Sequence, residues 1–452
     1  MNKVAHIPSS LARYRLVDAR LPVCLTEAEG LVPDQDGLAP ATLLIEAGRI
    51  AEITAGNPSP SDATPLVHLD GGIVLPTFTD IHTHLDKGHI WQRQRNLDGS
   101  FASALLACKA DRARWSAEDV RARMRFGLAS AYAHGTSVIR THIDSMIPQI
   151  RISWPVFAEL KEEWRGRIEL QGSTLFAVDL ALDDAHFADI SWAMREHGAM
   201  LGAVTYMGPQ LEAGLERLFR LAGERGSDLD FHVDETHDPA ARSLEVIADM
   251  AIAHRFAGKI LCGHCCSLAV QPDADARRII DKVAKAGIAI VSLPMCNLYL
   301  QDRDMAARRT PRWRGVTALH ELKAAGVEVM IASDNTRDPF YAYGDLDMLE
   351  VFCEGTRILH LDHPVADWLK AVSSTPASVM GAALEGGLRD GTVADLVLFR
   401  ARSFTELLAR PQADRTVLRS GAAIAAAPPD HRELDALSLL PPEEAGEGAR
   451  TQ

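Results

Sequence analysis

The chain has 452 residues, more than one typical domain, so we expect two structural units or one large barrel with an appendage. Apolar residues make up 47% and charged residues 24%, which is ordinary for a soluble globular protein and excludes a disordered or fibrous chain. The net charge of -14 disfavours nucleic acid and anionic membranes as partners, and no apolar run is long enough to span a membrane. Seven cysteines, an odd number, indicate a reducing compartment such as the cytoplasm rather than a disulfide scaffold.

The two ends of the chain predict short strands separated by turn residues. These strands are expected at residues 15–18, 42–46, 68–69, 394–399 and 415–419. Each flank alone is too short to bury a β core. We therefore expect residues 1–72 and 381–430 to pack together as one small β-sandwich, and residues 431–452 to form a flexible polar tail.

The middle of the chain, residues 73–380, alternates apolar strand patterns with amphipathic helical patterns. Strands are expected at residues 73–84, 137–144, 168–175, 200–207, 229–234, 259–264, 288–293 and 328–334. Helices are expected at residues 117–133, 152–164, 240–254, 274–286 and 315–325. This alternation predicts an α/β fold, and eight such units fit a closed (β/α)8 TIM-type barrel. A doubly wound open sheet is the alternative, but no Gly-rich loop follows the first strand.

Polar residues that end the predicted strands are the candidate site, because a (β/α)8 barrel carries its active site at that mouth. His82 and His84 lie two residues apart in strand one, so they face the same way. His232 ends strand five and Asp334 ends strand eight. Three imidazoles and one carboxylate suit Zn²⁺ or Fe²⁺ with a position left for water. The alternative is a set of satisfied core polar groups.

Other motifs are weaker. Cys262, Cys265 and Cys266 resemble half a zinc knuckle, but no second cysteine pair has suitable spacing, and buried inert thiols are the favoured reading. His142 and Asp144 close strand two, either as a supporting layer for a metal or as a structural pair. The sequence has no G-x-S-x-G elbow, no P-loop, and no zinc signature of the base-flipping deaminases.

These motifs together resemble a known family. Residues 75–87, which read Leu-Pro-Thr-Phe-Thr-Asp-Ile-His-Thr-His-Leu-Asp-Lys, resemble the strand-one signature of the amidohydrolase superfamily. The resemblance continues through residues 138–144, 231–235, 263–264 and 333–340, which are similar to bacterial cytosine deaminases. Residues 393–398 resemble the strand with which the superfamily chain returns to its sandwich.

The resemblance implies roles for individual residues. It implies that His82, His84, His232 and Asp334 bind one divalent metal ion. Glu235 would shuttle protons, and His264 would polarise the attacking water. Asp334 would also accept the proton of that water. Strand four lacks the lysine that bridges two metals in binuclear members, so one Zn or Fe ion is expected. The resemblance also implies a homo-oligomer.

The sequence departs from the cytosine deaminase pattern around the substrate. Ala177 or Val178 stands where those enzymes carry a glutamine, Asn335 replaces an aspartate, and Phe340 stands where a tryptophan closes the pocket. Losing an amide and shrinking an aromatic both widen the site. We therefore expect a deaminase that releases ammonia from a cytosine-like, 5-substituted or larger amino-substituted N-heterocycle.

Three other functions compete with this hypothesis. The first is a hydrolase of cyclic amides or N-substituted amines on the same barrel, which ammonia release without ring opening would exclude. The second is a binding protein with a decayed site, which predicts a missing ligand. The third is a nicotinamide oxidoreductase on an open sheet, which lacks its glycine fingerprint here.

Overall fold

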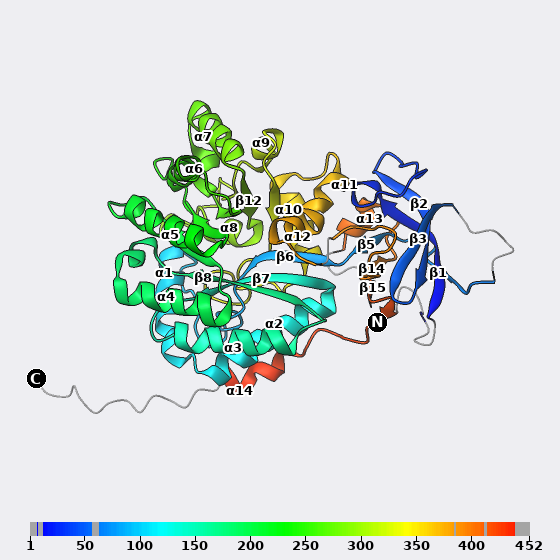
Figure 1. Cartoon of the computed structure of the whole chain (residues 1–452), viewed down its shortest axis with the longest axis horizontal. Helices are drawn as coiled ribbons and strands as arrows, with labels where there is room; N and C mark the ends of the chain where they lie inside the picture. Colours follow the sequence, from blue (N-terminus) through cyan, green and yellow to red (C-terminus); the bar gives the residue numbers. More distant parts are fainter. Residues whose placement is uncertain (1–6, 8–11, 57–62, 384–385, 411–413, 439–452) are drawn as a thin grey trace, which may run out of the picture.

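The protein has an α/β fold in two parts (Figure 1). A computed structural model describes residues 7, 12–56, 63–383, 386–410 and 414–438. The larger part, on the left of the view, contains parallel strands surrounded by helices. The smaller part, on the right, contains two four-stranded sheets. No helix of the described residues is long and apolar enough to cross a bilayer.

Eight parallel strands follow one another in chain order. They are β6 (Phe78–Thr83), β7 (Thr136–Asp144), β8 (Glu169–Leu175), β9 (Leu201–Thr205), β10 (Leu229–Val233), β11 (Ile260–His264), β12 (Ile288–Ser292) and β13 (Val329–Ile331). They form the sheets β6-β7-β8 and β9-β10-β11-β12-β13, and a bridge between Ser173 and Met200 joins β8 to the start of β9. A bridge between Thr83 and Asp334 brings the chain after β13 beside β6. The last strand of the series therefore lies next to the first.

Helices connect these strands and cover them. They are α1 (Phe101–Asp111), α2 (Ala117–His134), α3 (Ile150–Glu163), α4 (Asp184–His197), α5 (Leu211–Arg225), α6 (Ser243–His254), α7 (Asp273–Ala286), α8 (Pro294–Leu300), α9 (Leu319–Ala324), α10 (Met348–Leu359), α11 (Val365–Trp368) and α12 (Ser374–Met380). Helix α2 shows the local rules: the Ser116 side chain accepts a hydrogen bond from Asp119 N, and Gly135 ends the helix at a φ of 95°. A Cβ at Gly135 would lie 2.7 Å from Val397, so this turn requires glycine.

Short 3-10 helices complete the connections. They are η1 (Val23–Leu25), η2 (Arg112–Arg114), η3 (Val178–Leu182), η4 (Cys266–Val270), η5 (Leu369–Val372) and η6 (His431–Leu434).

Both ends of the chain contribute to the smaller part. One sheet has the order β3-β2-β1-β4 and the other has the order β16-β15-β14-β5. Their bounds are β1 (Arg13–Pro22), β2 (Leu38–Glu46), β3 (Arg49–Ala55), β4 (Leu66–His68), β5 (Val74–Pro76), β14 (Leu396–Phe399), β15 (Arg415–Arg419) and β16 (Ala422–Ala423), with α13 (Phe404–Leu408) between β14 and β15. Leu16, Leu43, Val74, Leu396 and Leu418 are buried in one shared apolar cluster.

The expected strand at residues 73–84 is divided into two strands. β5 pairs antiparallel with β14 in the smaller part, whereas β6 pairs parallel with β7. The switch takes two residues: Thr77 N donates to Asp395 O at 3.1 Å, and Phe78 N donates to Gly135 O at 2.9 Å. Every residue of both strands is buried, so the burial pattern does not mark the division.

The described part of the predicted tail contains η6 and α14 (Asp435–Ser438), which lie below α2 and α3 in Figure 1. The His431 ring lies 5.3 Å from the Phe126 ring, and Leu437 O accepts a hydrogen bond from Arg93 at 3.4 Å. Residues 439–452, the rest of that tail, lie outside the described residues.

An apolar cluster lies within the set of parallel strands. Ile81, Val138, Leu261, Val291 and Met330 come from five of the strands, and Val379 and Met380 of α12 join them. The C-terminal ends of the same strands instead carry buried polar residues. The apolar cluster thus lies inside the set of strands, and the buried polar residues lie at the C-terminal ends of the strands, which form the mouth.

Candidate active site

The four predicted metal ligands converge at that mouth. His82 lies in β6, His84 directly follows it, His232 lies in β10 and Asp334 follows β13. The Nε2 atom of His232 is 3.2 Å from Nε2 of His82 and 3.2 Å from Nε2 of His84. Asp334 Oδ1 is 3.2 Å from His84 Nε2 and 3.6 Å from His82 Nε2. The structure therefore brings all four residues together.

The spacing of these donor atoms fits one divalent metal ion. Ligands about 2.1 Å from a tetrahedral ion lie about 3.4 Å apart, close to the observed separations. Burial lowers the pKa of His82 and of His84 well below its usual range, so both imidazoles stay neutral, which is the form that binds metals. Both carboxylate oxygens of Asp334 are buried without a hydrogen-bond partner among the described groups. A bound cation would compensate this carboxylate.

The backbone at three strand ends is left-handed. The φ angles are 46° at Asp234, 68° at His264 and 61° at Asp334. Aspartate and histidine are among the non-glycine residues that adopt this conformation most often. Asp334 is held in place because its N donates to His82 O at 2.9 Å and its O accepts from Thr83 Oγ1 at 2.8 Å.

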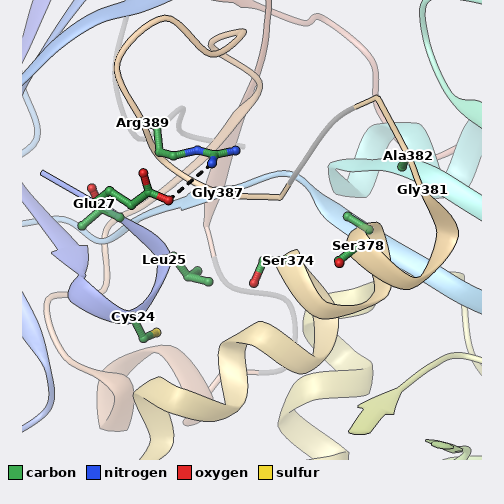
Figure 2. Close-up of a pocket in the computed structure, with 11 residues that line it drawn as sticks. Cys24, Leu25, Glu27, Ser374, Ser378, Gly381, Ala382, Gly387 and Arg389 are labelled. Carbon is green, nitrogen blue, oxygen red and sulfur yellow. Dashed lines mark hydrogen bonds and ion pairs between the residues drawn. The ribbon is translucent and has the colours of Figure 1, made fainter. Parts of the chain in front are cut away.

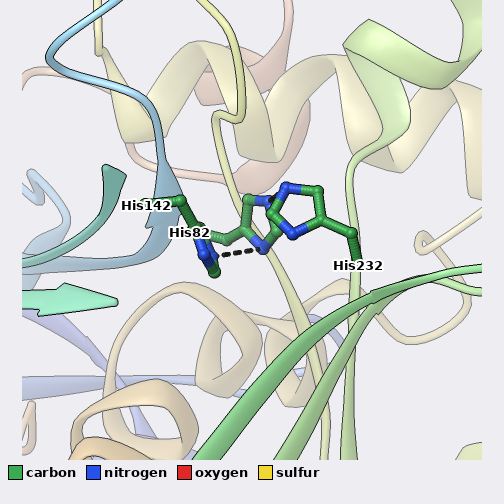
Figure 3. Close-up of side chains that lie close together, drawn as sticks. All are labelled: His82, His142 and His232. Carbon is green, nitrogen blue, oxygen red and sulfur yellow. Dashed lines mark hydrogen bonds between the residues drawn. The ribbon is translucent and has the colours of Figure 1, made fainter. Parts of the chain in front are cut away.

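His142 of β7 contacts the His82 ring at the nitrogen that is not near the other proposed ligands. Its Nε2 lies 3.1 Å from Nδ1 of His82, the ring nitrogen on the other side from the ligand cluster, and Figure 3 shows the His82, His142 and His232 rings together. Asp230 Oδ1 lies 3.7 Å from His142 Nε2, and Arg140 Nη1 donates to Asp230 Oδ2 at 3.1 Å. Contacts of this kind orient the ring of a metal ligand and select its tautomer.

Glu235, Asn297 and His264 form a hydrogen-bonded group beside the cluster. The Asn297 amide Nδ2 lies 3.1 Å from Glu235 Oε1 and 3.0 Å from His264 Nδ1. Because an amide Nδ2 can only donate, His264 Nδ1 accepts and the ring proton is on Nε2. That Nε2 is buried and has no partner among the described groups, and burial lowers the pKa of His264 to about 3. His264 is thus a neutral donor facing the site.

Asn297 was not predicted from the sequence. It lies in α8, five residues after β12, whereas the sequence argument considered the last residues of each strand. The available signal was its place in the loop region after strand seven, since such loops build the mouth of a (β/α)8 barrel.

A pocket of about 270 Å³ lies at these groups. It is lined by Glu235 and His264, by the proposed ligands His84, His232 and Asp334, and by Lys87, Asp144 and Phe340. A wider chamber of about 730 Å³ shares Phe101, Val204, Tyr206, His232 and Glu235 with this pocket. The site is therefore an inner pocket that continues into an outer chamber.

The predicted substrate contacts have different positions. Ala177, Asn335 and Phe340 line the inner pocket. The Asn335 amide already donates to Asp338 Oδ2 at 2.6 Å. Val178 does not line the pocket: it is buried in η3 against α5, where a Cβ on Gly214 would lie 2.9 Å from its Cγ2. η3 turns the Val178 side chain toward that helix, so of the two alternatives Ala177 is the one that lines the pocket.

Two further features lie apart from this chemistry. The thiols of Cys262, Cys265 and Cys266 are buried, and burial raises the pKa of each well above its usual range, as expected for inert thiols. A cavity of about 470 Å³ between η1 and α12, shown in Figure 2, is lined by none of the predicted site residues. An ion pair of 3.4 Å between Glu27 and Arg389 lies at its edge.

Comparison with known proteins identifies the family. The sequence pattern of the amidohydrolase family matches residues 149–425, more than half of the chain. The chain belongs to the amidohydrolase family. This amidohydrolase is 52% identical over 429 residues to a pterin deaminase of Rhizobium rhizogenes, covering 95% of this chain and 97% of that protein. The predictions of the family and of a hydrolase that acts on carbon–nitrogen bonds are confirmed.

Solved structures of similar fold extend the comparison. The amidohydrolase superposes on the 5-methylcytosine deaminase of Klebsiella pneumoniae with a TM-score of 0.79 at 24% identity, covering 92% of this chain and 98% of that one. It superposes on the N-isopropylammelide isopropylaminohydrolase of Burkholderia multivorans with a TM-score of 0.72 at 25% identity, covering 91% and 98%.

Proposed function

We propose that this amidohydrolase is a metal-dependent deaminase that removes the exocyclic amine of a 2-amino-4-oxopteridine, a pterin. The observation that carries the proposal is the convergence of one His–Asp cluster and one Glu–Asn–His group on the same buried pocket. The similarity to a pterin deaminase over 95% of the chain supports a bicyclic substrate, and the adjoining chamber offers it room.

The proposed scaffold is a (β/α)8 barrel with a small β-sandwich built from both chain ends. The parallel strands follow one another in chain order and the Thr83–Asp334 bridge places the last beside the first, which supports a closed barrel. The apolar cluster shared by the two small sheets supports the sandwich. Homo-oligomerisation, one metal ion per chain and the choice between Zn and Fe stay predictions.

The residues that would hold the ion are His82, His84, His232 and Asp334. A divalent ion in such a site lowers the pKa of water to about 7 and so supplies a nucleophile at neutral pH. Asp334 would accept one proton of the attacking water, since burial raises the pKa of its carboxyl to about 7.

Glu235 would move the other protons. Burial, followed by the nearby charge of Asp334, raises the pKa of Glu235 well above its usual range, which favours its protonated, acid form. It would protonate the ring nitrogen beside the reacting carbon while the water oxygen adds to that carbon. The His264 Nε2–H would donate to the added oxygen. When the carbon–nitrogen bond breaks, the proton taken by Asp334 leaves with the amine and the remaining proton of the added oxygen returns to Glu235. The products are an oxo ring and ammonia, and both carboxyl groups are restored.

An ammonia-release screen tests the proposal. Wild-type protein with quantified metal is given pterin, cytosine, 5-methylcytosine and an N-alkylated aminotriazine. We expect kcat/KM for pterin to exceed that for cytosine by about tenfold or more, because the site is built around a larger ring. Faster turnover of cytosine than of pterin would indicate a pyrimidine substrate instead. Release of an alkylamine without ammonia would favour a hydrolase of N-substituted amines, the activity for which the N-isopropylammelide isopropylaminohydrolase is named.

Replacing Asn297 with alanine is expected to move the alkaline limb of the pH profile of kcat/KM upward. Asn297 Nδ2 donates to Glu235 Oε1, which lowers the pKa of that carboxyl. Without this donor the pKa of Glu235 rises, by about one unit, and the acid form needed for catalysis persists to higher pH.

Gln301 provides the matched control for this experiment. Its amide Nε2 contacts Glu235 as well, but through the backbone O at 3.2 Å. The Gln301→Ala variant should therefore leave the alkaline limb in place. A limb that stays fixed or moves down in Asn297→Ala would refute the proposed role of Glu235 as an acid.

A further inference from the structure

A buried ammonium group lines the inner pocket without a role in the mechanism above. Lys87 follows His84 by three residues, and its side chain is 8% exposed. Its Nζ lies 3.4 Å from Asp144 Oδ1 and 5.2 Å from the centre of the Phe340 ring. The resemblance between residues 75–87 and the family signature includes Lys87 but gives it no function.

Asp144 has two cations beside it, and Lys87 and Arg112 both lower the pKa of its carboxyl. Arg112 Nε donates to Asp144 Oδ2 at 2.9 Å, and Arg112 Nη2 lies 2.7 Å from the same oxygen. Lys87 contacts the other carboxylate oxygen at the longer distance of 3.4 Å. Lys87 therefore shares the compensation of Asp144 with Arg112, and this single contact leaves its other N–H donors unused.

The ammonium has more donors than the protein satisfies. Lysine carries three N–H donors and no acceptor, and no described residue besides Asp144 accepts a hydrogen bond from Lys87. Burial alone would lower the pKa of Lys87, but the charges of Asp144 and of the further neighbours Cys108, Asp86 and Asp338 together outweigh it and the pKa is raised, so the group stays protonated. Lys87 thus offers unused donors in a pocket that it lines.

The position of Lys87 relative to Glu235 suggests which acceptor it meets. Lys87 comes after β6 and contacts the end of β7, the first two parallel strands, whereas Glu235 comes after β10, the fifth of the eight. In the usual tautomer of a 2-amino-4-oxopteridine, N3 carries hydrogen and N1 is the basic nitrogen. A ring that turns N1 toward Glu235 turns its N3–C4 oxo edge away from Glu235, toward the first strands.

We propose that Lys87 Nζ is a specificity-determining group that donates a hydrogen bond to the 4-oxo oxygen of the pteridine. This assignment rests on the proposed function, because it takes the reacting carbon to lie at the His–Asp cluster. It selects oxo-substituted aminoheterocycles against diamino analogues. An amino group at the same place is a donor, so two donors would face each other and neither would gain an acceptor there.

The test compares two substrates within each variant. We would measure kcat/KM for 2-amino-4-oxopteridine and for 2,4-diaminopteridine, counting only product that has lost its 2-amino group. The wild type should prefer the oxo compound by about 10- to 100-fold, as expected for one hydrogen bond to a charged group. Lys87→Met should bring this ratio close to one. A ratio within one variant does not change with the fraction of folded or metal-loaded protein.

The chain offers a matched control and a second variant. Lys109 is exposed on α1, so Lys109→Met makes the same substitution outside the pocket and should keep the wild-type ratio. Should Lys87→Met fail to fold, Lys87→Gln keeps a neutral donor beside Asp144 and should show a ratio lowered in the same direction.

The outcomes separate the two proposals. If the wild type deaminates both pteridines and the ratio is unchanged in the Lys87 variants, or the wild type shows no preference, the Lys87 assignment is overturned and the proposed function stands. If metal-loaded wild type releases no ammonia from either pteridine, the proposed function is overturned and the assignment with it.

Discussion

Replacing His82 with alanine should remove the bound metal and reduce kcat/KM for the deamination by about 1000-fold or more. His82 provides one of four donor atoms, and its Nε2 lies 3.2 Å from Nε2 of His232 and 3.6 Å from Oδ1 of Asp334. Metal chemistry of this kind contributes several kcal/mol to the transition state, and about 1.4 kcal/mol corresponds to a factor of ten. Metal content per chain, measured after dialysis, and steady-state kinetics check the prediction.

His68→Ala is the matched control for this experiment. His68 is exposed in β4 of the smaller part and pairs with Asp18 at 3.1 Å. This variant should keep both metal and activity. A His82→Ala protein that keeps one metal per chain and wild-type kcat/KM would show that the four residues do not form the metal site.

Glu235→Gln should keep the metal and lose about 100- to 10,000-fold in kcat, the usual contribution of a positioned acid–base group. Glu235 lies outside the set of four donors, and its Oε1 accepts from Asn297. The glutamine carbonyl can accept the same hydrogen bond, so the substitution removes the transferable proton with little change in packing. Metal analysis and single-turnover kinetics on one preparation separate binding from chemistry.

Glu224→Gln makes the same change on the exposed surface of α5 and should behave as wild type. Full kcat in Glu235→Gln with metal bound would remove Glu235 from the mechanism. Loss of metal together with kcat would instead indicate that Glu235 supports the ligand cluster.

The sequence was informative about the parallel strands and the residues that end them. Residues 259–264 were expected as a strand, and β11 occupies Ile260–His264. A buried strand leaves a continuous apolar run, and the polar residue that ends it stands out against that run. This contrast is why the sequence alone predicts His232 and Asp334 at one mouth.

The remaining features depend on contacts that no local pattern encodes. The division between β5 and β6 is set by two different partner strands, so it required the tertiary structure. Asn297 acts through hydrogen bonds to residues 62 and 33 positions away in the chain. Val178 was aligned to a pocket position, but the direction of its side chain follows from η3, which the strand pattern did not predict.

The short distance between β5 and β6 has an architectural consequence. Thr77 alone separates the strand that pairs with β14 from the strand that carries His82. The small sheets are therefore not an accessory that could be exchanged or trimmed independently of the chemistry. A substitution that displaces β14 would also shift β5 and, through Thr77, the position of the His82 side chain in β6. We therefore expect substitutions in the small sheets to be limited by their effect on the site.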